Sequence, residues 1–220
     1  MTHGITTIFH SLSFYGDDKY SHKAIREPQN VQRCIDAIHN THTEQHLIRH
    51  RMHARFEIDS IDQIPALEQN ILDGKIHLLS FMDHTPGQGQ YRNLEIYKET
   101  MRGYRSISEP EADVLIKEQI DKTKMTYEEI ERLSCLAIER NIAVASHDDD
   151  DVAKLELTQS YGTTISEFPI TLDVAKEAKR MGLYTIAGAP NILMGGSHSG
   201  NLSASEAIQA RVIDIVCSDY

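Results

Sequence analysis

The sequence predicts an α/β fold in which about seven parallel strands alternate with helices. Short aliphatic or β-branched runs alternate with amphipathic stretches along the chain, a pattern typical of parallel strands joined by helical crossovers. Charged or imidazole side chains close five of the seven runs, at the strand ends where parallel α/β folds build their sites. A chain of 220 residues can bury the core of one large domain. We therefore expect residues 1–220 to form a single domain.

The expected elements follow one another in chain order. The strand candidates are Ile5–Phe9, Arg51–Ile58, Ile76–Met82, Ile142–Ser146, Thr164–Phe168, Tyr184–Ala189 and Ile213–Cys217. The main helix candidates are Pro28–His42, Asp62–Leu72 and Thr171–Met181. Another helix is expected to begin after Thr126, because Thr126 and Glu129 have the spacing of a capping box.

The connection between the third and fourth strand candidates is far longer than the others. It runs from Thr85 to about Arg140, and its charged composition favours an inserted helical pair or a lid, at about residues 86–133. Seven strand and helix units are one short of a (β/α)8 barrel, and an open doubly wound sheet is the alternative. No glycine-rich dinucleotide or P-loop motif follows the first strand, which disfavours a nucleotide-binding open sheet.

Composition excludes several classes of protein. The formal net charge of -11 argues against a nucleic-acid partner, whose phosphates require a basic surface. No run of about 18 apolar residues and no secretory signal is present, so we expect no membrane partner. Three widely spaced cysteines indicate neither a disulfide framework nor a zinc ribbon, and a reducing cytoplasm fits them best.

The residues that close the strand candidates suggest a chemistry. Glu57 lies at the end of such a run, and His84, His147 and Asp219 each follow one. Carboxylate and imidazole groups are ligands of zinc-like or manganese-like ions, which lower the pKa of bound water and stabilise charge on a phosphoryl oxygen. The sequence therefore predicts metal-assisted hydrolysis at one mouth of the fold, with one or two divalent ions, zinc or manganese.

Each of these residues also has a structural interpretation. A single histidine at a strand end is often a hydrogen-bonded structural residue, and His84 could instead position a substrate or a lid. Asp148 and Asp149 lead into an acidic run that ends at Asp151, whose later members fit a solvated helix start. Glu167 fits a buried strand, with a supporting acid role as the alternative.

Glycine-rich segments suggest where phosphate could bind. Gly188–Asn191 is followed by Gly195–Asn201, a Gly/Ser-rich loop whose amides and hydroxyls suit phosphate oxygens. His198 lies in the middle of this loop and is a candidate acid or phosphate contact. An ordinary flexible turn is the other interpretation.

Taken in order, several short motifs make the chain resemble one family. It is the PhnM type of amidohydrolase-superfamily diphosphatase, from the carbon–phosphorus lyase (phosphonate) pathway. The matching motifs are Gly4–Thr7, His53–Glu57, Ser80–Gln88, Ala145–Asp149, Glu167–Pro169, Gly188–Asn191, Gly195–Asn201 and Ser218–Tyr220. They extend over essentially the whole chain, and the motifs around Met82–Gln88 and Gly195–Asn201 are long enough to be specific to this family.

The resemblance implies a distorted TIM barrel with a metal centre that removes diphosphate from a ribose 5-triphosphate carrying a phosphonate on C1. It implies metal-site roles for Glu57, His84, His147 and Asp219, with Asp219 as a ligand or as the base. His198 would act as a catalytic residue that meets the substrate. The implied substrate-binding residues are Arg55, Ser197, Asn191 and Gln88, and Arg92 is a further candidate cation for the polyphosphate.

The chain also departs from the family pattern. Its first strand candidate matches the second strand of the family barrel, so we expect the first strand, its ligand pair and the small β domain to be missing. Two unpaired sheet edges would then favour a homo-oligomer, and the chain could be inactive. The alternatives are a non-catalytic barrel remnant or binding protein, and an amidohydrolase acting on another substrate, since fold does not fix chemistry.

Overall fold

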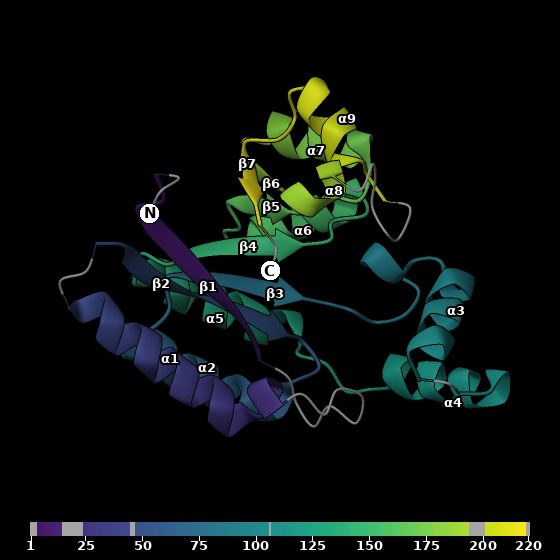
Figure 1. Ribbon diagram of the computed structural model, residues 1–220, viewed down its shortest axis with the longest axis horizontal. Helices are drawn as coiled ribbons and strands as arrows, with labels where there is room; N and C mark the ends of the chain where they lie inside the picture. The colour runs from purple at the N-terminus through teal and green to yellow at the C-terminus, as the bar shows by residue number, and fades with distance from the viewer. Residues whose placement is uncertain (1–3, 15–23, 45–46, 106, 194–200, 219–220) are drawn as a thin grey trace. The chain divides into compact units, whose positions relative to one another are not determined.

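The structure, a computed structural model, describes residues 4–14, 24–44, 47–105, 107–193 and 201–218. The chain divides into two compact units, Met1–Met82 with Lys124–Ala145 and Asp83–Thr123 with Ser146–Tyr220. Figure 1 shows the alternation of strands and helices that the sequence predicts, and the pairings recorded in each unit are parallel. The fold class is therefore α/β.

The first unit contains three complete strands and the beginning of a fourth. Its elements are β1 (Thr7–Phe14), η1 (Ala24–Arg26), α1 (Pro28–Thr43), β2 (Arg49–Glu57), η2 (Ile61–Gln63), α2 (Ile64–Leu72), β3 (Leu78–Met82), α5 (Tyr127–Glu139) and β4 (Ala143–His147). Strand β2 pairs with β1 on one side and with β3 on the other, and β3 pairs with the first residues of β4. Helix α1 packs on β1 and β2, and α2 contacts α5 (Figure 1).

Local sequence signals explain where these helices begin. Pro28 occupies the first turn of α1, where its missing N–H costs no hydrogen bond. Thr126 and Glu129 form the expected capping box of α5. Strand β1 extends to Phe14, beyond the predicted end at Phe9, because its parallel register with β2 continues as far as Phe14 opposite Phe56. The rings of Phe14 and Phe56 pack with their centroids 5.7 Å apart.

The second unit contains the end of β4 and three further strands. Its elements are η3 (Gly89–Tyr91), α3 (Leu94–Arg105), α4 (Glu109–Ile120), α6 (Val152–Ser160), β5 (Ile165–Glu167), α7 (Leu172–Arg180), β6 (Tyr184–Gly188), α8 (Ala189–Leu193), α9 (Ala204–Gln209) and β7 (Ile215–Cys217). Strand β6 lies between β5 and β7. Helices α6 and α7 pack together around buried Leu155, Val174, Ala178 and Leu183.

The strand order bears on the two predicted architectures. Strands β1 to β4 are neighbours in chain order in the first unit, and β5 to β7 are so in the second. Backbone bonding in the second unit continues from the end of β4 to β5, since the Asp148 N–H donates to the Glu167 carbonyl at 2.9 Å. Among the described residues, neither unit contains the reversal of strand order that defines a doubly wound sheet. This arrangement is consistent with an incomplete TIM-like barrel.

Burial and neighbouring histidines in the first unit affect the pKa of His77. His77 precedes β3, and its Nδ1 accepts the backbone N–H of Met52 at 3.1 Å. Its ring meets that of His42 with the centroids 4.3 Å apart. Burial, followed by the charges of His42, Arg51 and His39, lowers the pKa of His77 to about 4. The folded state therefore keeps His77 neutral at pH values where the unfolded chain binds a proton.

We expect this difference to destabilise the wild-type protein between about pH 6.5 and pH 4. The free energy of unfolding is unaffected by protonation of His77 above the unfolded-state pKa near 6.5. It decreases as the pH falls from there to the folded-state pKa. Because His77 is only half-buried, solvent screening reduces the effect to about 1–2 kcal/mol. Urea unfolding at pH 7.5 and pH 5 should show a smaller acid loss in His77→Asn, which keeps an acceptor without titrating. Equal losses in the two proteins would contradict this prediction.

Candidate metal centre

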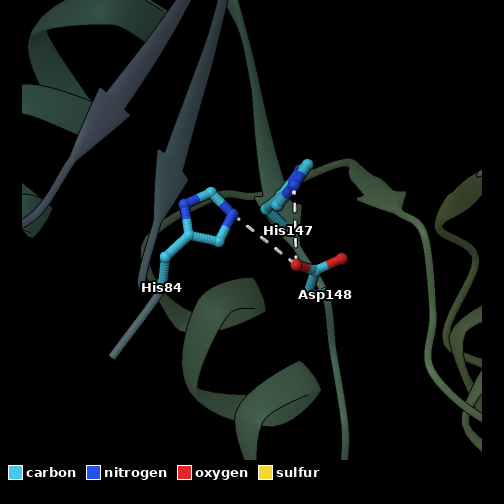
Figure 2. A group of neighbouring side chains, drawn as sticks. All are labelled: His84, His147 and Asp148. Carbon is cyan, nitrogen blue, oxygen red and sulfur yellow. Dashed lines mark ion pairs between the residues drawn. The ribbon is translucent and has the colours of Figure 1, made fainter. Parts of the chain in front are cut away.

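Three side chains of the second unit converge at the carboxyl end of β4. His147 is the last residue of β4, Asp148 follows it, and His84 lies two residues beyond the end of β3. One ligand atom from each residue lies within 4.8 Å of the others. Figure 2 shows both imidazole rings turned toward the Asp148 carboxylate. The fold thus brings together two histidines, His84 and His147, that are 63 positions apart in the sequence.

The separations within this cluster suit a shared cation. Oδ2 of Asp148 lies 3.8 Å from Nε2 of His84 and 3.7 Å from Nε2 of His147. Ligand atoms bonded at about 2.0–2.1 Å around a tetrahedral zinc ion lie about 3.3 Å apart, so the observed distances need to close only slightly. His147 and Asp148 are both buried, with 4% and 5% of their surface exposed.

The carboxylate beside His147 supports the same fit. Nδ1 of His147 lies 3.3 Å from Oε2 of Glu167, the last residue of β5. A carboxylate this close to Nδ1 favours the tautomer with its proton on Nδ1, and Nε2 of the same ring lies 3.7 Å from Oδ2 of Asp148. Oδ2 of Asp148 is buried and accepts no hydrogen bond from the described residues. Two electron-pair donors that face each other in a buried place are stabilised by a cation between them.

The backbone at the end of β4 is held by a lysine and by a turn. Lys154, in the first turn of α6, donates from Nζ to the carbonyl oxygens of His147 at 2.8 Å and Asp148 at 3.0 Å. Asp148 has a φ of 50°, a left-handed conformation that is uncommon outside glycine but better tolerated by aspartate. This turn separates the directions of two neighbouring side chains, so that both reach the cluster.

The four consecutive aspartates from Asp148 to Asp151 have four different surroundings. Asp151 is the N-cap of α6 and accepts the N–H of Lys154 at 2.7 Å, as a solvated helix start requires. Asp150 accepts the N–H of Gly89 at 2.9 Å. Asp149 is fully buried, and burial raises the pKa of its carboxyl group. Its Oδ2 bonds the hydroxyls of Ser146 at 2.6 Å and Ser166 at 2.5 Å. Only Asp148 reaches the cluster.

Aromatic rings border the two histidines. The ring of His84 contacts that of Tyr91, with the centroids 5.9 Å apart, and Tyr91 in turn packs on Tyr97 of α3. The rings of His147 and Phe168 lie nearly perpendicular, with their centroids 5.2 Å apart. Phe168 has a φ of 58°, and its N–H donates to the carbonyl of Ile186 on the next strand. These rings limit the orientations of the imidazoles.

The other predicted site residues have different surroundings. Glu57 is buried at the end of β2 in the first unit, and Arg55 of the same strand donates from Nε to Sδ of Met82 at 3.2 Å. Nε2 of Gln88 is buried and has no hydrogen-bond partner among the described residues. Asn191 bonds Leu202 and Ala204 at the start of α9, which gives its amide a structural contact. Ser197, His198 and Asp219 lie outside the described residues.

Of the three clustered residues, His84 and His147 were predicted metal-site residues, whereas Asp148 was placed in the acidic run after the fourth strand candidate without a metal role. The signal that could have found Asp148 is its place directly after His147, because a turn at a strand end can direct two adjacent side chains to one point. Glu167 was interpreted as buried strand material with a possible supporting role, and its contact with His147 agrees with that alternative.

Comparison of the sequence with known proteins identifies a similar protein. The chain is similar to the alpha-D-ribose 1-methylphosphonate 5-triphosphate diphosphatase of Escherichia coli (strain K12), with 34% identity over 219 residues. The match covers 99% of this chain and 57% of that protein, so the chain spans a little over half the length of this relative. No model of a known protein family matches the chain.

A solved structure gives a weaker likeness. It is the N-acetylneuraminic acid (sialic acid) synthetase from Leptospira borgpetersenii serovar Hardjo-bovis, with 15% identity and a TM-score of 0.43. The match covers 76% of this chain and 54% of that one, and it carries no functional assignment. The similarity in sequence to the Escherichia coli protein, by contrast, extends over nearly the whole chain and supports a relationship to a diphosphatase family of that type.

Proposed function

We propose that this chain belongs to a metal-dependent hydrolase that acts on a phosphorylated sugar phosphonate and releases diphosphate. The observation that carries the proposal is the convergence of His84, His147 and Asp148 in the second unit. The substrate class is supported by the similarity to a diphosphatase whose name specifies alpha-D-ribose 1-methylphosphonate 5-triphosphate. Membership in the amidohydrolase superfamily is part of the same proposal.

The three clustered residues would hold a divalent cation, zinc or manganese. Such an ion, when bound, supplies a Lewis acid that lowers the pKa of bound water and offsets charge on phosphoryl oxygens. Glu167 would favour the His147 tautomer with its proton on Nδ1, so that Nε2 could bind the ion, and Lys154 bonds the backbone carbonyls of His147 and Asp148. Glu57, which the family pattern also assigns to a metal, and a second ion remain predictions from the sequence.

The reaction we propose is the hydrolysis of a phosphoanhydride. A water oxygen forms a bond to phosphorus, the anhydride bond between the α and β phosphoryl groups breaks, and diphosphate leaves the 5-monophosphate. Asp219 is the proposed base for the water proton, and His198 is the proposed acid or phosphate contact. Arg55, Ser197, Asn191 and Gln88 are the proposed substrate contacts. Their roles follow from the sequence resemblance.

The partners that we propose also follow from the sequence. The substrate is the only small-molecule partner that the proposal requires, and self-association remains a prediction from the two expected sheet edges. No helix within the described ranges is long and apolar enough to cross a membrane.

Phosphorus-31 NMR of the zinc- or manganese-loaded protein with ribose 1-methylphosphonate 5-triphosphate tests the proposal. We expect diphosphate and the 5-monophosphate in equal amounts, with a rate at least about 100-fold lower in Asp148→Asn, because a ligand carboxylate is lost. Asp173→Asn is the matched control, because the Asp173 side chain is 95% exposed and lies outside the cluster. Metal-loaded protein that hydrolyses only amides or cyclic amides, or nothing, would contradict the diphosphatase assignment.

A further inference from the structure

The loop that carries His84 is attached to the Asp148 segment at Gly89. The N–H of Gly89 donates to Oδ2 of Asp150 at 2.9 Å. Gly89 is buried and has a φ of 53°, and a Cβ at this position would lie 3.3 Å from Cβ of Asp148 and 3.4 Å from its carbonyl oxygen. Only glycine combines this backbone conformation with so close an approach.

The rest of this loop is stiffened by its own hydrogen bonds. At its beginning, the N–H and hydroxyl of Thr85 donate to Oδ1 of Asp83. At its end, the N–H of Gly87 donates to the carbonyl of Tyr91, and the N–H of Tyr91 donates to the carbonyl of Gln88. The contact at Gly89 therefore positions a preformed loop rather than a single residue.

Tyr91 connects the attachment point to His84. It belongs to the same short helix as Gly89, and its ring packs against the imidazole of His84. A shift of Gly89 away from Asp150 would therefore move the surface on which the His84 ring lies. His147 and Asp148 are fixed separately, by β4 and by Lys154, so His84 is the cluster member whose position depends on this loop.

We propose that Gly89 and Asp150 form a latch that holds His84 at the metal-binding distance from Asp148. This inference rests on the proposed metal site and adds two positioning residues to it. Neither residue offers an atom to the three-residue cluster. Residues that orient metal ligands typically change metal affinity by about 10–100-fold when they are removed.

Calorimetric titration of zinc or manganese into the full chain tests the latch through three variants. Asp150→Ala removes the acceptor, Asp150→Asn keeps an acceptor oxygen but removes the charge, and Asp151→Asn removes a neighbouring charge while it keeps a helix cap. We expect the metal dissociation constant to rise about 10–100-fold in Asp150→Ala and to stay within about 3-fold of wild type in the other two. Equal losses in Asp150→Ala and Asp150→Asn would assign the effect to charge and overturn the latch.

Hydrogen exchange of the metal-free protein separates the latch from the proposed function. We expect the amides of residues 84–91 to exchange faster in Asp150→Ala than in wild type, while those of α6 do not change. If wild-type protein binds no metal, the proposed function fails, and this exchange result alone decides whether the latch exists. If wild type binds metal and Asp150→Ala binds it equally well, the latch is wrong and the metal site stands.

Discussion

Replacing His147 with alanine is expected to abolish tight binding of divalent metal. The substitution removes one of the three proposed ligands, together with its contact to the Glu167 carboxylate. Loss of an orienting partner alone costs about 10–100-fold in affinity, so loss of the ligand should raise the metal dissociation constant by more than about 100-fold. Plasma mass spectrometry after dialysis against metal-free buffer and reloading with zinc or manganese measures the stoichiometry.

A second buried histidine provides the control for His147→Ala. His53 lies in β2 and is 5% exposed, and its ring nitrogens bond the hydroxyls of Ser11 and Ser80 at 3.0 Å and 2.7 Å. His53→Ala should lower stability without changing the metal content. Equal metal content in His147→Ala and wild type would remove His147 from the site.

Replacing Asp149 with alanine is expected to destabilise the second unit by about 2–4 kcal/mol. Asp149 joins Ser146 of β4 to Ser166 of β5 through one buried oxygen. Its removal leaves a cavity and takes the shared acceptor from two buried hydroxyls, of which Ser146 keeps only a 3.3 Å contact to the Ile165 carbonyl. Each buried polar group that loses its partner costs about 1–3 kcal/mol.

Urea denaturation of Asp149→Ala should be compared with two other variants. Asp149→Asn keeps an acceptor and should stay close to wild type, because burial already favours the uncharged carboxyl group. Asp151→Ala loses only the helix cap of α6, which costs about 1 kcal/mol. The prediction fails if Asp149→Ala is no more destabilising than Asp151→Ala.

Much of the fold could be predicted from hydrophobic periodicity and from residues that begin helices. Each of the seven predicted runs overlaps a strand, because apolar runs of this length between helical stretches are typical of strands in an α/β protein. Helix starts at Pro28 and Thr126 follow from backbone chemistry that does not depend on tertiary contacts. The end of β1 could not be predicted, because it is fixed by pairing with β2, whose register is a long-range property.

The candidate site was only partly predictable for a similar reason. His84 and His147 stand at strand ends, and parallel strands bring such ends together, so their convergence could be expected from the sequence. The separate surroundings of Asp148, Asp149 and Asp150 depend on a left-handed turn at Asp148 and on the approach of Gly89 from another segment. Four identical residues in a row carry no information about which of them faces which partner.

The proposed function depends on His84, His147 and Asp148 holding a divalent metal ion. A crystal of the protein grown with zinc, with anomalous diffraction recorded on both sides of the zinc absorption edge, tests it most directly. We expect one strong anomalous peak within bonding distance of Nε2 of His84, Nε2 of His147 and Oδ2 of Asp148. A loaded crystal with its zinc bound elsewhere, or with no peak at these three atoms, would contradict it.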